Sequence, residues 1–413
     1  MNMKEMLEIT RLLRTGGLTE ATSMIQRTLK GIDTSQFKPN IPDAPLDATV
    51  IEGSFHVIDD ESPSSTTAQP STEESPHSPF GHIPAPPVLD WQKYFDKASR
   101  PARTPAPARE AEPGGKFTSG SYTNDAGTRA YKLYIPSSYH GQKMPLVVML
   151  HGCTQDPDDF AAGTRMNVLA EEHQCLVVYP AQAKTANHGK CWHWFKAEDQ
   201  VRDRGEPSLI AGITKKIIST YAVDTQRVYV AGLSAGGAMA AVMGRTYPDI
   251  YTAVGVHSGL PYGAARDMPS AFAAMQGGVT NHSSYSSNTQ GAIPCEQSVP
   301  MIVFHGDKDT KVHPRNGDQV ITQWIAVHAS NKPHATANQK PRASVQQGQV
   351  PNGHAYSRII YRNTSEQIIL EQWRIHGAGH AWSGGSASGS YTDPKGPDAT
   401  REMMRFFYDH RRP

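Results

Sequence analysis

Cysteine is scarce in this sequence, and its few cysteines form no recognisable metal-binding pattern. The chain of 413 residues has four cysteines, and no two of them form a C-x-x-C pair. Four cysteines are too few for a disulfide scaffold, and their spacing argues against a structural zinc site. The metalloprotease pattern H-E-x-x-H is absent as well. We therefore predict neither a bound metal nor a cofactor.

The sequence also lacks a long apolar run and a block of like charges. No segment approaches the roughly 18 apolar residues of a membrane span. The first residues, MNMKEMLEITRLLRTGG, lack the continuous apolar core and cleavage site of a secretory signal, which predicts a cytoplasmic location. A net charge of +1 without charge clusters gives no electrostatic footprint for nucleic acid or an anionic membrane, so we expect neither partner.

Composition divides the chain into three parts. Residues 1–32 carry apolar side chains at helical spacing on both sides of a Gly-Gly break, which predicts a short helical hairpin. Residues 33–114 are rich in proline and serine with little apolar periodicity, which predicts a disordered linker. Residues 115–413 have the character of a folded domain. The apolar face that precedes the glycine break consists of Met6, Ile9, Leu12 and Leu13.

The folded part alternates apolar strand-like segments with amphipathic helical ones. This alternation predicts an α/β fold with a mostly parallel sheet covered by helices on both faces. Such sheets place their sites at the carboxyl ends of the strands, where this chain has the segments LHGC, GLSAG, HSG and HGDKD. The predicted strands are residues 131–136, 145–152, 175–180, 227–232, 253–259, 301–306 and 368–375.

Ser234 lies in the most informative segment, VYVAGLSAGGAMAA. The letters G-L-S-A-G match the G-x-S-x-G elbow, in which a strand meets a helix at a turn that presents a nucleophilic serine. The β-formers before Ser234 and the helix formers after it fit that order. A glycine-rich phosphate loop is the rival interpretation, but the Lys-Ser/Thr pair that such a loop needs is missing.

A serine nucleophile needs a base and an acid, which follow it in this order in the α/β-hydrolase arrangement. His380, in the glycine-flanked loop HGAGHAWSGG, is the predicted base, because the competing His376 lies nearer the end of its strand. The acid is Asp307 or Asp309 in the segment HGDKD. The residues alone do not decide between them, because strand alternation sends both aspartates to the same side.

An ester-hydrolysis transition state also needs two backbone N–H donors for its oxyanion. We expect one to be the N–H of Ala235, directly after the serine. The other belongs on the loop that follows an earlier strand, where we assign the N–H of Cys153 in LHGCTQ.

Taken together, the motifs resemble the esterase family that includes the catalytic domains of poly-3-hydroxybutyrate depolymerases, within the α/β-hydrolase superfamily. The resemblance covers about residues 116–410 and rests on LHGCTQ, YPAQ, KCWHWF, YVAGLSAGGAMAAVM, VHSGLPYGAA, FHGDKDTKV and GAGHAWSGG. It implies a nucleophile at Ser234, an acid at Asp309 and a base at His380, in the order of the type 1 catalytic domain. The implied reaction hydrolyses short-chain hydroxyalkanoate esters through an acyl-enzyme.

The resemblance leaves the substrate open. The same family contains feruloyl and acetylxylan esterases, and a scaffold protein associated with polymer granules is an alternative outside enzymes. Trp192, Trp194 and Trp382 flank the motifs and are candidates to line an apolar cleft for an ester polymer or oligomer. Buried packing is the alternative for Trp192 and Trp194.

Two further hypotheses concern the cysteines and the N-terminus. We predict a Cys153–Cys191 bridge, because both segments would border the active-site cleft and a link would fix the oxyanion loop. A cytoplasmic enzyme would normally keep these thiols reduced, which argues against the bridge.

We also expect the hairpin, residues 1–31, to bind a polymer surface or a second copy of the chain, because two short helices cannot form a core alone.

Overall fold

The computed structural model describes residues 114–277, 299–330 and 341–412. The predicted hairpin at residues 1–32 and nearly all of the predicted linker at 33–114 lie outside the described residues. In the described ranges no helix is long and apolar enough to cross a membrane.

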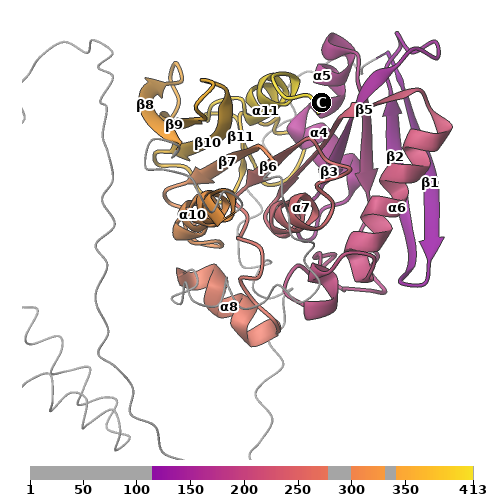
Figure 1. The fold of residues 1–413 in the computed structure, drawn as a ribbon, viewed down its shortest axis with the longest axis horizontal. Coiled ribbons are helices and arrows are strands. Elements are labelled where there is room, and N and C mark those ends of the chain that lie inside the picture. The colour runs from indigo at the N-terminus through magenta and orange to yellow at the C-terminus, as the bar shows by residue number, and fades with distance from the viewer. Residues whose placement is uncertain (1–113, 278–298, 331–340, 413) are drawn as a thin grey trace, which may run out of the picture. The chain divides into compact units, whose positions relative to one another are not determined.

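The strands of the described domain form one large sheet and one very small one (Figure 1). All seven predicted strands are present, and the sequence pattern missed strands near the two sheet edges. The strands are β1 (Lys116–Asn124), β2 (Gly127–Ile135), β3 (Met144–Leu150), β4 (Leu176–Pro180), β5 (Val223–Leu233), β6 (Ala253–His257), β7 (Met301–Gly306), β8 (Arg342–Gln349), β9 (Ala355–Arg362), β10 (Ile368–Ile375), β11 (Trp382–Ser383) and β12 (Thr392–Asp393).

The large sheet has a parallel centre and antiparallel ends. Among the described residues its ten strands lie in the order β1-β2-β4-β3-β5-β6-β7-β10-β9-β8. The strands from β4 to β10 in this order are parallel, while β1-β2 and β9-β8 are antiparallel hairpins. Every residue of β3, MPLVVML, is buried, whereas β8, RASVQQGQ, is half exposed. The apolar central strands are covered on both faces, and the polar edge strands meet solvent.

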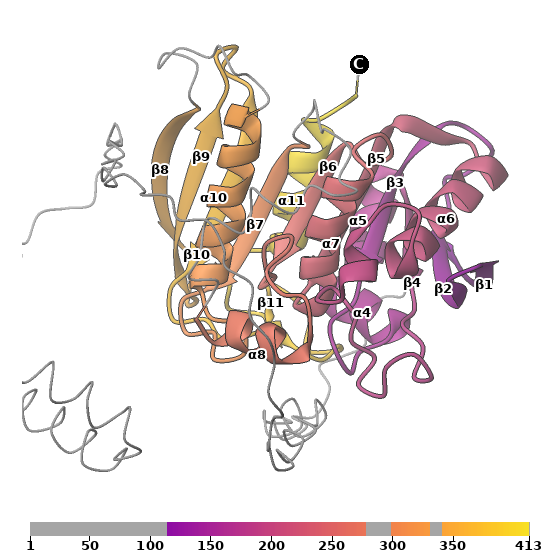
Figure 2. The ribbon, with the colours of Figure 1, turned by 60° about the horizontal axis from the view of Figure 1, so that its bottom comes forward.

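Helices cover both faces of the sheet, as predicted (Figure 2). Apolar side chains of α6, α7, α8 and α10 join one buried cluster, and those of α4, α5 and α11 join the cluster on the opposite face. The chain between β3 and β4 forms two consecutive helices, α4 and α5, separated by Arg165 with a φ of 56°. The helices are α4 (Pro157–Thr164), α5 (Met166–His173), η2 (Ala197–Gln200), α6 (Gly205–Thr220), α7 (Ala235–Thr246), α8 (Met268–Gly277), α10 (Arg315–Ser330) and α11 (Ala399–Tyr408).

The register of the parallel strands brings their carboxyl ends to one edge. Leu233 at the end of β5 pairs with His257 at the end of β6, and His257 pairs with Phe304 of β7. At the next pair, Gly306 of β7 lies opposite Ile375 of β10. The loops that follow β5, β6, β7 and β10 therefore begin at the same edge, which is where parallel sheets place their sites.

Candidate active site

Ser234 occupies a sharp turn between β5 and α7. Its backbone has a φ of 58° and a ψ of −119°, a conformation that non-glycine residues rarely adopt. The crossing is tight, since a Cβ atom on Gly232 would meet the carbonyl oxygen of Gly236, and one on Gly236 would meet that of Leu150. The flanking glycines are thus required by close backbone approach, and the strand, turn and helix follow in the predicted order.

The turn is fixed by the neighbouring strand ends. The Ser234 N–H donates a hydrogen bond to the carbonyl oxygen of His257 at 2.9 Å. On the other side lies the loop after β3, where a Cβ atom on Gly152 would be 3.6 Å from the Cβ of Ser234. The serine is 4% exposed, so its hydroxyl lies in a largely water-excluded setting.

Asp309 and His380 form a buried pair. His380 Nδ1 is 2.7 Å from Asp309 Oδ2, and the two side chains are 6% and 0% exposed. The other carboxylate oxygen accepts the N–H groups of Lys311 and Val312, each at 2.9 Å. Burial alone would raise the pKa of Asp309, but His380 and His305 hold it well below its ordinary value. Asp309 is therefore ionised, and it fixes the orientation of the His380 ring.

The two competing residues form a pair of their own at the surface. His376 Nδ1 is 3.1 Å from Asp307 Oδ2, and these side chains are 40% and 30% exposed. The expectation that Asp307 and Asp309 point the same way is wrong. The Asp309 N–H bonds to the carbonyl oxygen of Gly306 at 3.2 Å, so the chain turns here and strand alternation no longer applies.

The two predicted oxyanion donors, Ala235 and Cys153, lie on the two backbone segments next to Ser234. Ala235 is the first residue of α7, so its N–H has no acceptor within the helix. The Cys153 N–H donates to no acceptor among the described residues. Cys153 follows Gly152, the residue that lies against Ser234. Two unengaged N–H groups near one serine are what an oxyanion site requires.

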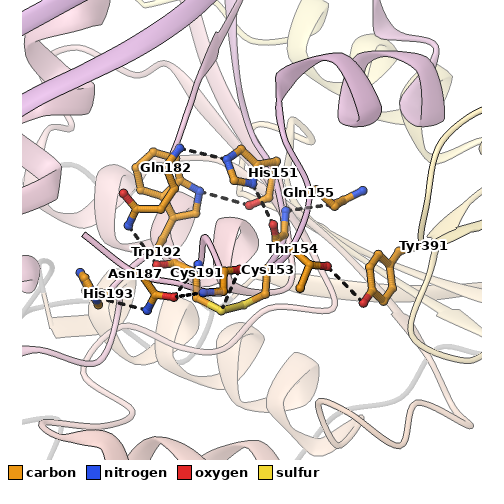
Figure 3. The surroundings of a disulfide bond; sticks show 12 residues. His151, Cys153, Thr154, Gln155, Gln182, Asn187, Cys191, Trp192, His193 and Tyr391 are labelled. Atoms are coloured by element: carbon orange, nitrogen blue, oxygen red, sulfur yellow. Dashed lines mark hydrogen bonds between the residues drawn. A yellow bond between two sulfur atoms is a disulfide. The ribbon is translucent and has the colours of Figure 1, made fainter. Parts of the chain in front are cut away.

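The predicted Cys153–Cys191 disulfide is confirmed, with an S–S distance of 2.04 Å (Figure 3). Two hydrogen bonds accepted by His151 join the loop after β3 to the segment that carries Cys191 and to a third segment. The carbonyl oxygen of His151 accepts from Trp192 Nε1 at 3.1 Å, and the His151 ring accepts from the Gln182 N–H at 3.1 Å. The loop after β3 is thus held at several points rather than by the bridge alone.

A buried polar cluster, which sequence reasoning missed, supports the segment that carries Cys191. Glu206 accepts hydrogen bonds from the His193 N–H at 2.7 Å and ring at 2.9 Å, and from Arg129 at 3.2 Å. Burial opposes its ionisation, but His193 and Gln182 lower its pKa below the ordinary value. Because Gln182 also donates to the carbonyl oxygen of Cys191 at 2.9 Å, the cluster stabilises the partner of the oxyanion loop.

The three tryptophans do not line a cleft. Trp192, Trp194 and Trp382 are only 0%, 3% and 1% exposed, and this corrects the prediction that they contact an ester substrate. Trp192 packs on the His151 ring at 5.6 Å, and Trp382 donates from its indole N–H to Thr400 at 2.9 Å. The alternative of buried packing describes Trp192 and Trp194, and it extends to Trp382.

Tyr391 is a half-buried aromatic residue beside the buried pair, and no sequence motif pointed to it. Its ring lies edge-on to His380 with centroids 6.4 Å apart, and its hydroxyl accepts from Thr154 Oγ1 at 3.3 Å. Its contacts therefore connect the loop of the predicted base with the loop of the predicted oxyanion donor, and Figure 3 shows the Thr154–Tyr391 hydrogen bond. The polar segment GSYTDPKG has no periodicity that would have placed it there.

The fold and this arrangement define the class of protein. A parallel sheet with a serine elbow after one strand and a His–Asp pair on two later loops is an α/β-hydrolase. A family model described as "Esterase PHB depolymerase" matches residues 129–346, more than half of the chain. The chain belongs to this family, as the sequence motifs had indicated. His380 lies beyond the matched residues, so its assignment rests on its contact with Asp309.

Individual relatives point in two directions. The chain is 32% identical over 261 residues to "Poly(3-hydroxyalkanoate) depolymerase C" of Paucimonas lemoignei, covering 62% of this chain and 59% of that protein. It is 29% identical over 249 residues to "Probable acetylxylan esterase A" of Aspergillus fumigatus, covering 56% of this chain and 66% of that protein. The match therefore spans about three fifths to two thirds of each relative.

A solved structure shows the same fold. The acetyl xylan esterase from Aspergillus awamori superimposes with a TM-score of 0.53 at 20% sequence identity, over 71% of this chain and 99% of that one. At this identity the likeness concerns the fold and not the substrate.

The two His–Asp pairs lead to a first prediction. Asp309→Asn should lower kcat on a p-nitrophenyl ester by about 10⁴-fold, because the amide no longer fixes the His380 tautomer. Asp307→Asn is the matched control on the same loop and should stay within a few-fold of the unaltered protein. The opposite ranking in steady-state kinetics would move the acid to Asp307.

The disulfide leads to a second prediction. Mass spectrometry of non-reduced peptides should find Cys153 linked to Cys191, and a double change to alanine should lower the free energy of unfolding by about 2–4 kcal/mol. Cys295→Ser serves as the control and should leave the linked peptide unchanged. Detection of Cys153 as a free thiol, or linked to Cys295, would reject the bridge.

Two buried histidines lead to a prediction about pH. Burial lowers the pKa of His151 to about 4 and that of His257 to about 3, whereas an unfolded histidine titrates near about 6.5. Between these values the unfolded chain binds more protons than the folded one, so stability falls as the pH falls.

Urea denaturation should therefore give a lower free energy of unfolding at pH 5 than at pH 7.5, with about 1–2 kcal/mol of the loss due to His257. His257→Gln should reduce the difference between the two pH values. An unchanged difference in that variant would show that His257 is protonated in the folded protein.

Proposed function

We propose that this protein is a serine esterase that hydrolyses short-chain hydroxyalkanoate esters, as in polyhydroxybutyrate or its oligomers. The observation that carries the proposal is the buried Asp309–His380 pair, which lies on loops at the same sheet edge as the strained Ser234 turn. A surface histidine with a structural role would not need a fully buried, ionised carboxylate behind it.

In the proposed reaction, Ser234 Oγ attacks the ester carbonyl carbon while the Nε2 atom of His380 takes the hydroxyl proton. The carbonyl oxygen becomes an oxyanion, which the N–H groups of Cys153 and Ala235 stabilise. When the C–O bond breaks, the leaving alkoxide takes the proton from His380, and the acyl group remains on Ser234. Water then repeats these steps and releases the acid.

The family and the name of the depolymerase relative support the proposed substrate. Acetylxylan esterase activity is the second candidate, and it is favoured by the names of the fungal relatives. Tyr391 places a half-buried aromatic ring edge-on to His380, and such a ring can make apolar contact with a small ester group. A granule-associated scaffold without activity would have no use for the buried pair.

The cytoplasmic location expected from the N-terminal residues stays a prediction. The Cys153–Cys191 bridge weighs against the cytoplasm, because disulfides persist in oxidising compartments.

The role of the serine is tested by Ser234→Ala, which should lower kcat on a p-nitrophenyl ester by at least about 10⁴-fold. The thermal unfolding temperature of this variant should stay close to that of the unaltered protein. Ser219→Ala, a change of an exposed serine on α6, is the matched control and should keep the full rate. A wild-type rate in Ser234→Ala would overturn the proposed nucleophile.

The substrate class is tested by a panel that uses one preparation of the protein. We expect kcat/KM to be highest on 3-hydroxybutyrate oligomers, lower for acetate release from acetylated xylan, and lowest on methyl ferulate. Faster deacetylation of xylan would replace the hydroxyalkanoate assignment with the second candidate.

A further inference from the structure

His257, in the strand-end segment VHSG, has no part in the reaction proposed above, yet it lies at the centre of the site. It is the last residue of β6 and is completely buried. Its ring is stacked between Phe304, at 5.7 Å and 10°, and Trp382, at 5.1 Å and 25°. The two aromatic faces leave the imidazole free to interact only through its edge.

That edge makes two hydrogen bonds with defined directions. Nε2 accepts the N–H of Ser383 at 3.0 Å, so this nitrogen carries no proton. The ring proton is therefore on Nδ1, which lies 3.2 Å from Ser258 Oγ. Burial, together with the nearby histidines His305 and His380, lowers the pKa of His257 to about 3, so the neutral form is kept.

The two ends of His257 contact the two halves of the proposed catalytic machinery. Its carbonyl oxygen accepts the N–H of Ser234 at 2.9 Å, and its ring holds Ser383. Ser383 follows His380 by only three residues. One buried residue thus connects the turn of the nucleophile to the loop of the base, although these lie far apart in the sequence.

We propose that His257 is a positioning residue, whose ring Nε2 holds the His380 loop in register with Ser234 by accepting the Ser383 N–H. The proposal rests on the proposed esterase function. Its ring does not touch substrate or exchange protons, because it is fully buried between two aromatic side chains. Loss of the acceptor would leave a buried N–H unpaired, and the loop would shift to satisfy it.

The test compares His257→Phe with His257→Gln. Phenylalanine keeps the ring stacking and removes the acceptor, while the amide oxygen of glutamine can take the place of Nε2. We expect His257→Phe to lower kcat on a p-nitrophenyl ester by about 10- to 100-fold with less than a threefold change in KM, because a small misplacement of reacting groups costs up to about 10²-fold. His257→Gln should recover most of the rate.

His410→Gln is the matched control. The ring of His410 also makes two hydrogen bonds in a partly buried position. They lead to the carbonyl oxygens of Phe406 and Ile368, each at 2.6 Å. We expect this variant to lose stability while keeping kcat. If His410→Gln loses kcat as much as His257→Phe does, the effect is a general one and the positioning role is rejected.

The remaining outcomes separate the inference from the function on which it rests. A folded His257→Phe variant with the wild-type kcat, or a glutamine variant as slow as the phenylalanine variant, would overturn the positioning role. Absence of hydrolysis of every ester by the unaltered protein, together with no labelling by a fluorophosphonate, would instead overturn the proposed function. A thermal unfolding measurement shows whether each variant is folded. If one of them is not, His257→Asn takes the place of His257→Gln, and His257→Leu takes the place of His257→Phe.

Discussion

The backbone turn at Ser234 is the constraint on which the rest of the site depends. A positive φ at a non-glycine residue is costly, and it persists only when the surroundings fix it. Here the β5 to α7 crossing has no room for a Cβ atom at Gly232 or Gly236, and the His257 carbonyl oxygen holds the Ser234 N–H. The strain is thus maintained by the packing of the strands on either side.

Parallel pairing then determines which loops can reach the serine. The ends of β5, β6, β7 and β10 lie in register, so four separate loops begin at one edge. Burial sorts the side chains on these loops into two pairs that have the same chemistry and different surroundings. The Asp309–His380 pair is closed off from water, whereas the Asp307–His376 pair is open to it. The same residue types therefore give a buried, oriented imidazole in one case and a hydrogen-bonded surface pair in the other.

Much of this arrangement follows from the sequence, because it depends on local pattern. The apolar segments gave the central strands, and the G-x-S-x-G spacing gave the turn at Ser234. The choice of Asp309 over Asp307 could not come from alternation, because the chain leaves the strand at Gly306 and the two side chains diverge. Family resemblance supplied that choice.

The incorrect prediction for the tryptophans and the contacts that were not predicted have a common physical cause. Whether a tryptophan faces a cleft or a core depends on what packs over it, and for Trp192 and Trp382 this comes from remote segments. The contact of Tyr391 with His380 and the bond from Ser383 to His257 likewise join residues whose positions no local pattern specifies. In the sequence these residues stand in polar segments or at a strand end, where nothing distinguishes them from ordinary loop residues.

The proposed reaction requires Ser234 to be a nucleophile activated by His380 and Asp309. Its most direct test is to label the folded protein with a fluorophosphonate and to map the modified residue by peptide mass spectrometry. We expect one adduct, on Ser234, which is absent from Ser234→Ala and forms far more slowly in His380→Ala. An adduct on another serine, or equally fast labelling of Ser234 without His380, would contradict it.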